Sequence, residues 1–121
     1  MGTLEYLDAV KKLIGLTSDY QLAKMLDLEP SNITMYRKRR RVMDDYIASR
    51  VADLLKIEEL ELIAQANAER EKNEEKRVYW EAKAKTAREN REPLDVLVAD
   101  ACRRKNRLAG LVGTASKPLE L

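Results

Sequence analysis

The sequence predicts an all-α fold. No run of alternating β-branched or aromatic residues indicates a strand. Apolar residues instead recur at helical spacing, and Leu, Ala, Glu, Lys and Arg are prominent in a chain with 36% charged and 45% hydrophobic residues. With 121 residues, the chain can bury a real core in one domain that carries an appendage.

The first expected helix spans about residues 3–14 of a domain that we place at residues 1–68. Thr3 is the expected N-cap, and Gly15 is the expected terminator because glycine accepts the left-handed conformation that ends many helices. The expected buried stripe consists of Leu4, Leu7, Val10 or Lys11, and Ile14.

The second and third helices are expected to be separated by a short turn. Ser18 is the expected cap of a helix that runs to about Leu26, and residues 27–29 form the turn. Pro30 suits the first turn of the next helix, because backbone N–H groups in a first turn have no intrahelical acceptor and proline therefore loses no hydrogen bond there. That helix ends in the unbroken basic run 37–41.

Two further helices complete the expected domain. Asp44 or Asp45 caps the fourth helix, and the fifth begins at about Glu58. The expected buried positions are Ile47, Val51, Leu54 and Leu55 in the fourth helix, and Leu60, Ile63 and Ala64 in the fifth.

Residues 69–110 are expected to form a helical extension. Asn73 followed by two glutamates resembles a cap with an acidic first turn, which favours a break and a sixth helix over 74–90. One long helix through 58–90 is the alternative. Pro93 marks the next boundary. The seventh helix carries an apolar stripe of Leu94, Leu97, Val98, Ala101 and Cys102.

Composition excludes most catalytic chemistry. The chain has no histidine, its single cysteine is Cys102, and its four glycines form no phosphate-binding loop. We therefore expect no enzyme, no metal, no cofactor and no small-molecule substrate. No apolar stretch of about 18 residues predicts a membrane span, so we expect a cytoplasmic protein with no membrane partner and a flexible tail at 111–121.

The segment from Ser18 to Arg39 has the pattern of a helix-turn-helix. A short turn between two packed helices leaves one face of the second helix exposed, and such a face can enter the major groove of DNA. The expected apolar anchors are Leu22, Ala23, Leu26, Leu28, Ile33 and Tyr36.

With these anchors, the segment resembles the helix-turn-helix of the lambdoid repressor and Cro family (XRE-type), whose five-helix domain fits residues 4–63. The Leu-Leu-x-Ile ending formed by Leu54, Leu55 and Ile57 also matches. The whole chain further resembles an uncharacterised group of proteins from filamentous phages and prophages. The residues that carry this second resemblance are Ala66-Asn67-Ala68-Glu69-Arg70-Glu71 and Trp80-Glu81.

Three positions depart from the family pattern. Asp27 replaces the usual glycine of the turn, and Asp tolerates the left-handed conformation better than most residues. Glu29 replaces the usual serine cap. The segment Arg37-Lys38-Arg39 replaces the usual Glu-x-Gly ending and makes that end of the helix more cationic.

The family's geometry implies two sets of DNA contacts. Base edges would meet Ser31, Asn32, Thr34 and Met35, because Asn can pair with adenine while methyl groups can contact thymine. The candidate phosphate contacts are Tyr20, Gln21, Arg37, Lys38, Arg39, Arg40 and Arg41.

Specific binding in this family normally needs two copies on a two-fold site. The extension supplies candidate dimerisation residues, and packing onto their own domain is the alternative. The candidates are Trp80, Leu94, Leu97, Val98 and Ala101.

These features predict a sequence-specific regulator of transcription that binds double-stranded DNA as a homodimer, and the resemblance implies a phage or prophage repressor acting at an inverted repeat. Two alternatives stay open. One is a phage protein-interaction factor that inhibits a host protein. The other is a low-specificity DNA-binding protein involved in replication.

Overall fold

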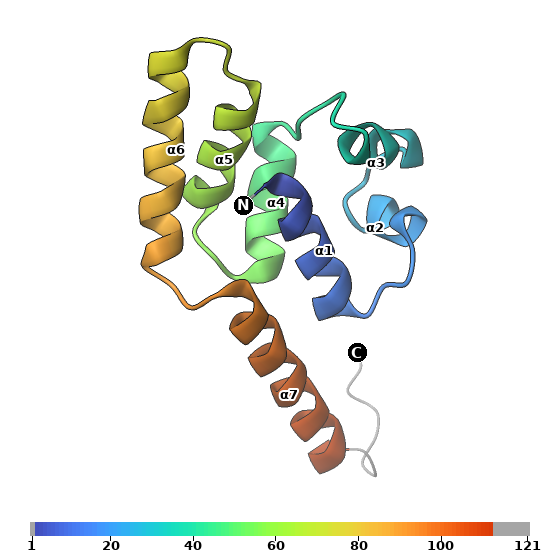
Figure 1. The fold of residues 1–121 in the computed structure, drawn as a ribbon. Helices are drawn as coiled ribbons and strands as arrows, with labels where there is room; N and C mark the ends of the chain where they lie inside the picture. The colour runs from blue at the N-terminus through green and yellow to red at the C-terminus, as the bar shows by residue number, and fades with distance from the viewer. Residues whose placement is uncertain (1, 113–121) are drawn as a thin grey trace.

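The computed structural model describes residues 2–112, with side chains described as far as Arg104, and over this range every regular element is an α-helix, as predicted. Figure 1 shows α1, α4 and α5 at the centre, α2 and α3 on one side, and α6 on the other. The elements are α1 (Thr3–Ile14), α2 (Asp19–Met25), α3 (Pro30–Arg37), α4 (Asp45–Leu55), α5 (Glu59–Arg70), α6 (Glu74–Glu89) and α7 (Leu94–Val112).

Three helices begin at side-chain caps that the sequence predicts. Ser18, Asp44 and Asn73 each accept a hydrogen bond from the backbone N–H three residues later, at 3.2, 2.9 and 3.0 Å. Each bond satisfies one of the N–H groups that a first turn leaves without a partner. The cap at Asn73 begins α6, so the predicted break after α5 is confirmed.

The predicted cap at Thr3 is wrong. Gly2 is the N-cap of α1, and Thr3 is the first residue inside the helix. The Thr3 side chain is buried toward α5, where its hydroxyl donates to Glu69 at 2.8 Å and its N–H donates to the same carboxylate at 2.9 Å. A carboxylate from a distant helix therefore replaces the local cap at the positive end of α1.

The first four helices end in the same way, on a residue in the left-handed conformation. The N–H of the following residue donates to the carbonyl five positions back, at 2.8–3.0 Å, which is the Schellman arrangement. The left-handed residues are Gly15 (φ 83°), Asp27 (59°), Arg39 (59°) and Lys56 (61°).

The core is formed by the facing sides of α1 to α5, and the start of α7 packs against α1 beside it. Its fully buried members include Leu7, Leu22, Ile33, Val51 and Leu62. Burial of such side chains contributes about 1.5–3 kcal/mol each, so this apolar cluster is the main source of the fold's stability.

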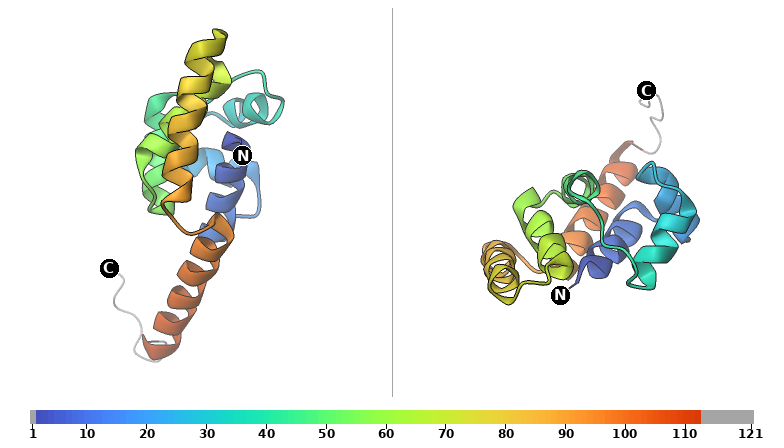
Figure 2. Two further views of the ribbon diagram at one scale, coloured as in Figure 1. Left: turned by 60° about the vertical axis from the view of Figure 1, so that its left-hand side comes forward. Right: turned by 90° about the horizontal axis from the view of Figure 1, so that it is seen from above.

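Helix α5 lies between α4 and α6 and is buried on most of its circumference (Figures 1 and 2). Its buried residues include Glu61 and Leu62, whereas Leu60 is 39% exposed. The prediction that Leu60 faces the core is wrong. Ala66 of α5 belongs to the main core, whereas Ala64 and Ala68 of α5 and Ala84 and Ala87 of α6 are buried outside it, and their small side chains allow these two helices to approach closely.

Helix α7 attaches to the body by its first turns and then projects away from it (Figures 1 and 2). Leu94 is buried, and Leu97 and Val98 pack partly against the core. The helix runs to Val112, two residues beyond its predicted end, and the remainder of the predicted flexible tail lies outside the described residues. Among the residues that the structure describes, no helix has the length and apolarity needed to span a membrane.

Candidate nucleic-acid interface

Helices α2 and α3 form a packed pair on one side of the molecule, away from α6 (Figure 1). Leu22 and Ala23 of α2 are fully buried, as is Ile33 of α3, and Tyr36 is nearly so. These are the anchors that the helix-turn-helix pattern predicts. Because Ile33 and Tyr36 hold one side of α3 in the core, the opposite side of α3 faces outward.

The turn between the two helices depends on Asp27. Its left-handed conformation lets the Leu28 N–H reach the Ala23 carbonyl at 2.8 Å, which closes the end of α2. Glu29 is the N-cap of α3 but makes no side-chain capping bond, and Pro30 occupies the first helical turn. An aspartate therefore adopts the conformation expected at this position, at modest conformational cost.

The four predicted base-contacting residues share the outward side of α3. At 100° per residue Ser31, Thr34 and Met35 lie opposite Ile33 and Tyr36, and Asn32 lies at the edge of this side, about 40° from Tyr36. Two of them are exposed and two are half-buried. They are Ser31 and Thr34, which are exposed, and Asn32 and Met35, which are half-buried.

Four of the predicted phosphate-contacting residues follow α3 directly, and we call Lys38–Arg41 the basic segment. All four side chains are exposed. Among the described residues, no carboxylate lies within ion-pair distance of any of them. Uncompensated cations beside an exposed helix face produce the local positive potential that attracts a phosphate backbone.

Arg37 is arranged differently from the basic segment. Its guanidinium donates two hydrogen bonds to Asp19, at 2.9 and 3.1 Å, and lies 2.8 Å from a carboxylate oxygen of Asp8. These contacts raise the pKa of Arg37, while the Arg37 guanidinium, together with Lys11, holds the pKa of Asp19 below its usual value. We call Asp8, Asp19 and Arg37 the outer cluster. It joins α1, α2 and α3, so Arg37 has structural partners besides any phosphate.

The two candidates at the start of α2 are both exposed. The side-chain oxygen of Gln21 accepts from the N–H and the hydroxyl of Thr17, at 2.8 and 3.1 Å, so its amide N–H groups face outward as donors. The ring of Tyr20 carries the Lys24 ammonium 5.3 Å from its centroid, which adds a cation at this end of the pair.

The dimerisation candidates do not form one continuous exposed surface. Leu94 is buried within its own chain, and Leu97 and Val98 are half-buried against the core, so these three pack onto their own domain. Ala101 and Trp80 are half-buried on different helices, and Trp80 packs edge-on against Tyr79 with ring centroids 5.2 Å apart.

Sequence reasoning missed a buried polar cluster on the far side of α1, which we call the inner cluster. Glu61 of α5 is fully buried and receives two hydrogen bonds from Arg91, at 2.7 and 2.5 Å, and a third from the Tyr6 hydroxyl. Burial, together with Glu61, raises the pKa of Tyr6 well above its ordinary value, and the bonds to Glu61 raise that of Arg91. The available signal was a glutamate flanked by leucines in α5.

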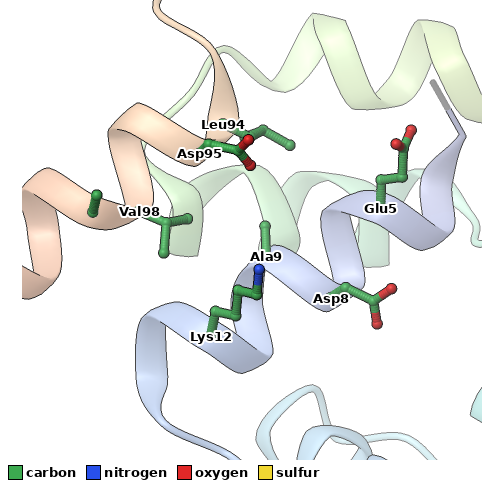
Figure 3. Close-up of a pocket in the computed structure, with 8 residues that line it drawn as sticks. Glu5, Asp8, Ala9, Lys12, Leu94, Asp95 and Val98 are labelled. Carbon is green, nitrogen blue, oxygen red and sulfur yellow. The ribbon is translucent and has the colours of Figure 1, made fainter.

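A cavity between α1 and α7 is lined by both apolar and charged residues (Figure 3). Leu94 and Val98 face Ala9 across it. Two of its acids have partners elsewhere, because Asp8 belongs to the outer cluster and Glu5 accepts from the Gly2 N–H. No metal-ligating group of three or more residues occurs among the described residues.

Comparison of the chain with protein-family models, with curated proteins and with solved structures finds no match. The geometry of α2, α3 and the basic segment is therefore what indicates a function for this chain.

Proposed function

We propose that this protein is a sequence-specific regulator of transcription that binds double-stranded DNA. Residues 1–68 would be its five-helix, repressor-like domain, and residues 69–110 a helical extension. The observation that carries the proposal is the outward side of α3, which is followed directly by four exposed cations without carboxylate partners among the described residues.

In this proposal α3 enters the major groove, whose width of about 12 Å admits a helix. Asn32 would donate to and accept from adenine, and the Thr34 methyl and Met35 would contact a thymine methyl. The basic segment would contact backbone phosphates and so contribute affinity more than sequence preference. The base-reading set is small, which favours two copies on an inverted repeat, each reading one half-site.

The test is selection of binding sequences from a random duplex pool, followed by binding measurements on the selected and scrambled duplexes at physiological salt. We expect a preference of at least about 10³-fold. Alanine at Ser31, Asn32 and Met35 should abolish most of this preference while the protein still binds DNA through its cations.

A charge-matched comparison isolates the basic segment. Arg39→Ala with Arg40→Ala should weaken binding to all sequences and reduce the salt slope by about two, since each phosphate contact contributes about 0.9. Lys83→Ala with Lys85→Ala removes the same charge from exposed positions on α6, away from α3, and should change little.

Two outcomes would contradict the proposal and favour its alternatives. Tight, salt-sensitive binding without sequence preference would indicate a low-specificity DNA-binding protein. Absence of DNA binding by the intact chain would favour a protein-interaction factor.

Sedimentation at the concentrations used for binding tests the homodimer, because a monomer at full site occupancy would contradict it. Repression at a phage or prophage promoter, which the resemblance implies, is then tested with a reporter gene that carries the selected site.

A further inference from the structure

We infer that Arg41 is a positioning residue that orients the side chain of Asn32 for base recognition, an inference that rests on the proposed function. A guanidinium N–H of Arg41 donates to Asn32 Oδ1 at 3.0 Å. The two residues are nine positions apart in sequence. Along a continued helix they would be separated by about 13 Å, so a chain reversal must bring them together.

The backbone supplies that reversal. Arg39 adopts the left-handed conformation, and the Arg40 N–H donates to the Met35 carbonyl at 2.9 Å, which turns the chain back along α3. Downstream, the Met43 side chain is buried and its carbonyl accepts from Arg70 at 2.5 Å. The backbone of Arg41 is therefore held at both ends, and its side chain is directed toward the first turns of α3.

The chemistry of the contact determines which atom of Asn32 faces outward. A guanidinium can only donate hydrogen bonds, so the amide atom that meets Arg41 is the oxygen. That oxygen retains one further acceptor position, and both N–H donors remain available. Reading adenine needs one donor and one acceptor from the same amide. Arg41 thus presents Asn32 in an orientation that keeps both functions.

The contact also reduces the freedom that Asn32 must lose on binding. A charged donor makes a stronger hydrogen bond than a neutral one, and a side chain that is already ordered has less entropy to lose in the complex. Arg40 is the natural reference, because it is an exposed arginine beside Arg41 and has no described side-chain hydrogen bond to α3. Arg41 should therefore affect both affinity and sequence preference, whereas Arg40 should affect affinity alone.

The experiment compares Arg41→Ala with Arg40→Ala on the selected duplex and on duplexes substituted at each base pair in turn. Both variants should lose affinity on every duplex and reduce the salt slope by about one. Only Arg41→Ala should also reduce discrimination at the base pair that Asn32→Ala identifies. One bidentate amide–base contact provides a discrimination of roughly 5- to 150-fold against the wrong base. Arg41→Ala should remove a large part of that discrimination.

A double-mutant cycle supplies a readout that loss of charge alone would not change. Arg41→Ala introduced into Asn32→Ala should cause no further loss of discrimination at that base pair, although affinity should still fall. Arg41→Lys keeps the charge with a single compact ammonium in place of the planar fork, so it should restore affinity more fully than discrimination.

The outcomes separate this inference from the proposed function. A wild-type protein without base preference would overturn both. A wild-type preference that Asn32→Ala abolishes, but that Arg41→Ala and Arg40→Ala leave equally intact, would overturn the role of Arg41 alone. Independent effects of Asn32→Ala and Arg41→Ala on discrimination would also overturn it.

Discussion

Helix α1 takes part in two clusters on two of its sides, and in each of them an arginine pairs with carboxylate groups, two in the outer cluster and one in the inner cluster. The outer cluster joins α1 to α2 and α3, and the inner cluster joins it to α5 and to the connection between α6 and α7. Both use bidentate arginine contacts. They differ in exposure, because the Glu61 side chain is 1% exposed in the inner cluster whereas that of Asp19 is 40% exposed in the outer one.

That difference determines what each cluster contributes. The charges of the inner cluster have lost their water, so removing one partner leaves the other without compensation in a poorly polarisable environment. The charges of the outer cluster keep much of their hydration, and each pair adds little free energy. Removing one partner from the inner cluster should therefore cost more stability than removing one from the outer cluster.

The largest expected effect comes from breaking the inner cluster. Arg91→Met should lower the free energy of unfolding by about 3–5 kcal/mol, because it leaves the buried Glu61 carboxylate without its cation. Denaturant unfolding measures the loss. Arg77→Met is the control, since Arg77 pairs with Glu74 and Glu81 on the surface of α6 and should cost less than about 1 kcal/mol.

Glu61→Met combined with Arg91→Met distinguishes a buried charge from lost packing. Replacing both partners by apolar side chains should recover much of the stability that the single change removes. A double variant at least as unstable as Arg91→Met would contradict the electrostatic account of the inner cluster.

Alkaline pH should weaken the inner cluster through Tyr6. The pKa of Tyr6 is raised in the folded protein, so the folded state holds this proton more tightly than the unfolded chain does. The stability that Tyr6 contributes is therefore present below about pH 10 and is lost as the pH rises further, with a slope of up to about 1.4 kcal/mol per pH unit. Tyr6→Phe should reduce the dependence of the unfolding free energy on pH between about pH 8 and 11.5. Tyr46→Phe, at an exposed tyrosine, should not reduce it.

Acidic pH should weaken the outer cluster, and the loss of folding stability should be smaller than the loss that alkaline pH causes at the inner cluster. The pKa of Asp19 is lowered in the folded protein, chiefly by Arg37, so its contribution is present above about pH 4 and is lost as the pH falls through the folded value. Asp19→Asn should cost less than about 1 kcal/mol at neutral pH, because both partners are partly hydrated. The difference from wild type should shrink on acidification. Asp53→Asn, at an exposed aspartate, should show no such change.

The smallest expected effect is a gain. Arg39→Gly should stabilise the fold by about 0.5 kcal/mol, because relief of the left-handed conformation exceeds the added entropy of glycine in the unfolded chain. The same change should weaken DNA binding by removing a cation. Arg40→Gly removes the same charge at a residue that is not left-handed. In thermal unfolding, only Arg39→Gly should therefore raise the unfolding midpoint.

Three helix starts were predictable because their causes are local. Ser18, Asp44 and Asn73 cap the helices whose first residues they precede, and each bond spans three residues. The anchors Ile33 and Tyr36 were predictable for a similar reason, since the spacing of apolar residues determines which side of a short helix is buried.

The contacts of the clusters were not predictable, because their partners lie far apart in the chain. Arg37 is separated by 18 residues from Asp19, and Tyr6 by 55 from Glu61. Leu60 was assigned to the core from helical periodicity, but it lies at the first turn of α5 beside Val78 and Tyr79 of α6 and is 39% exposed. Periodicity predicts that a helix has a buried side, and tertiary packing decides how much of its circumference is covered.

The left-handed helix ends also constrain how the surface of this protein can vary. Asp27, Arg39 and Lys56 are all exposed, and exposed positions ordinarily accept almost any residue. At these three, β-branched side chains would clash with their own backbone, whereas glycine and asparagine would fit. A library of variants sorted for folded protein should therefore be depleted of β-branched residues at these three solvent-facing positions, because of the backbone angle and not because of any contact.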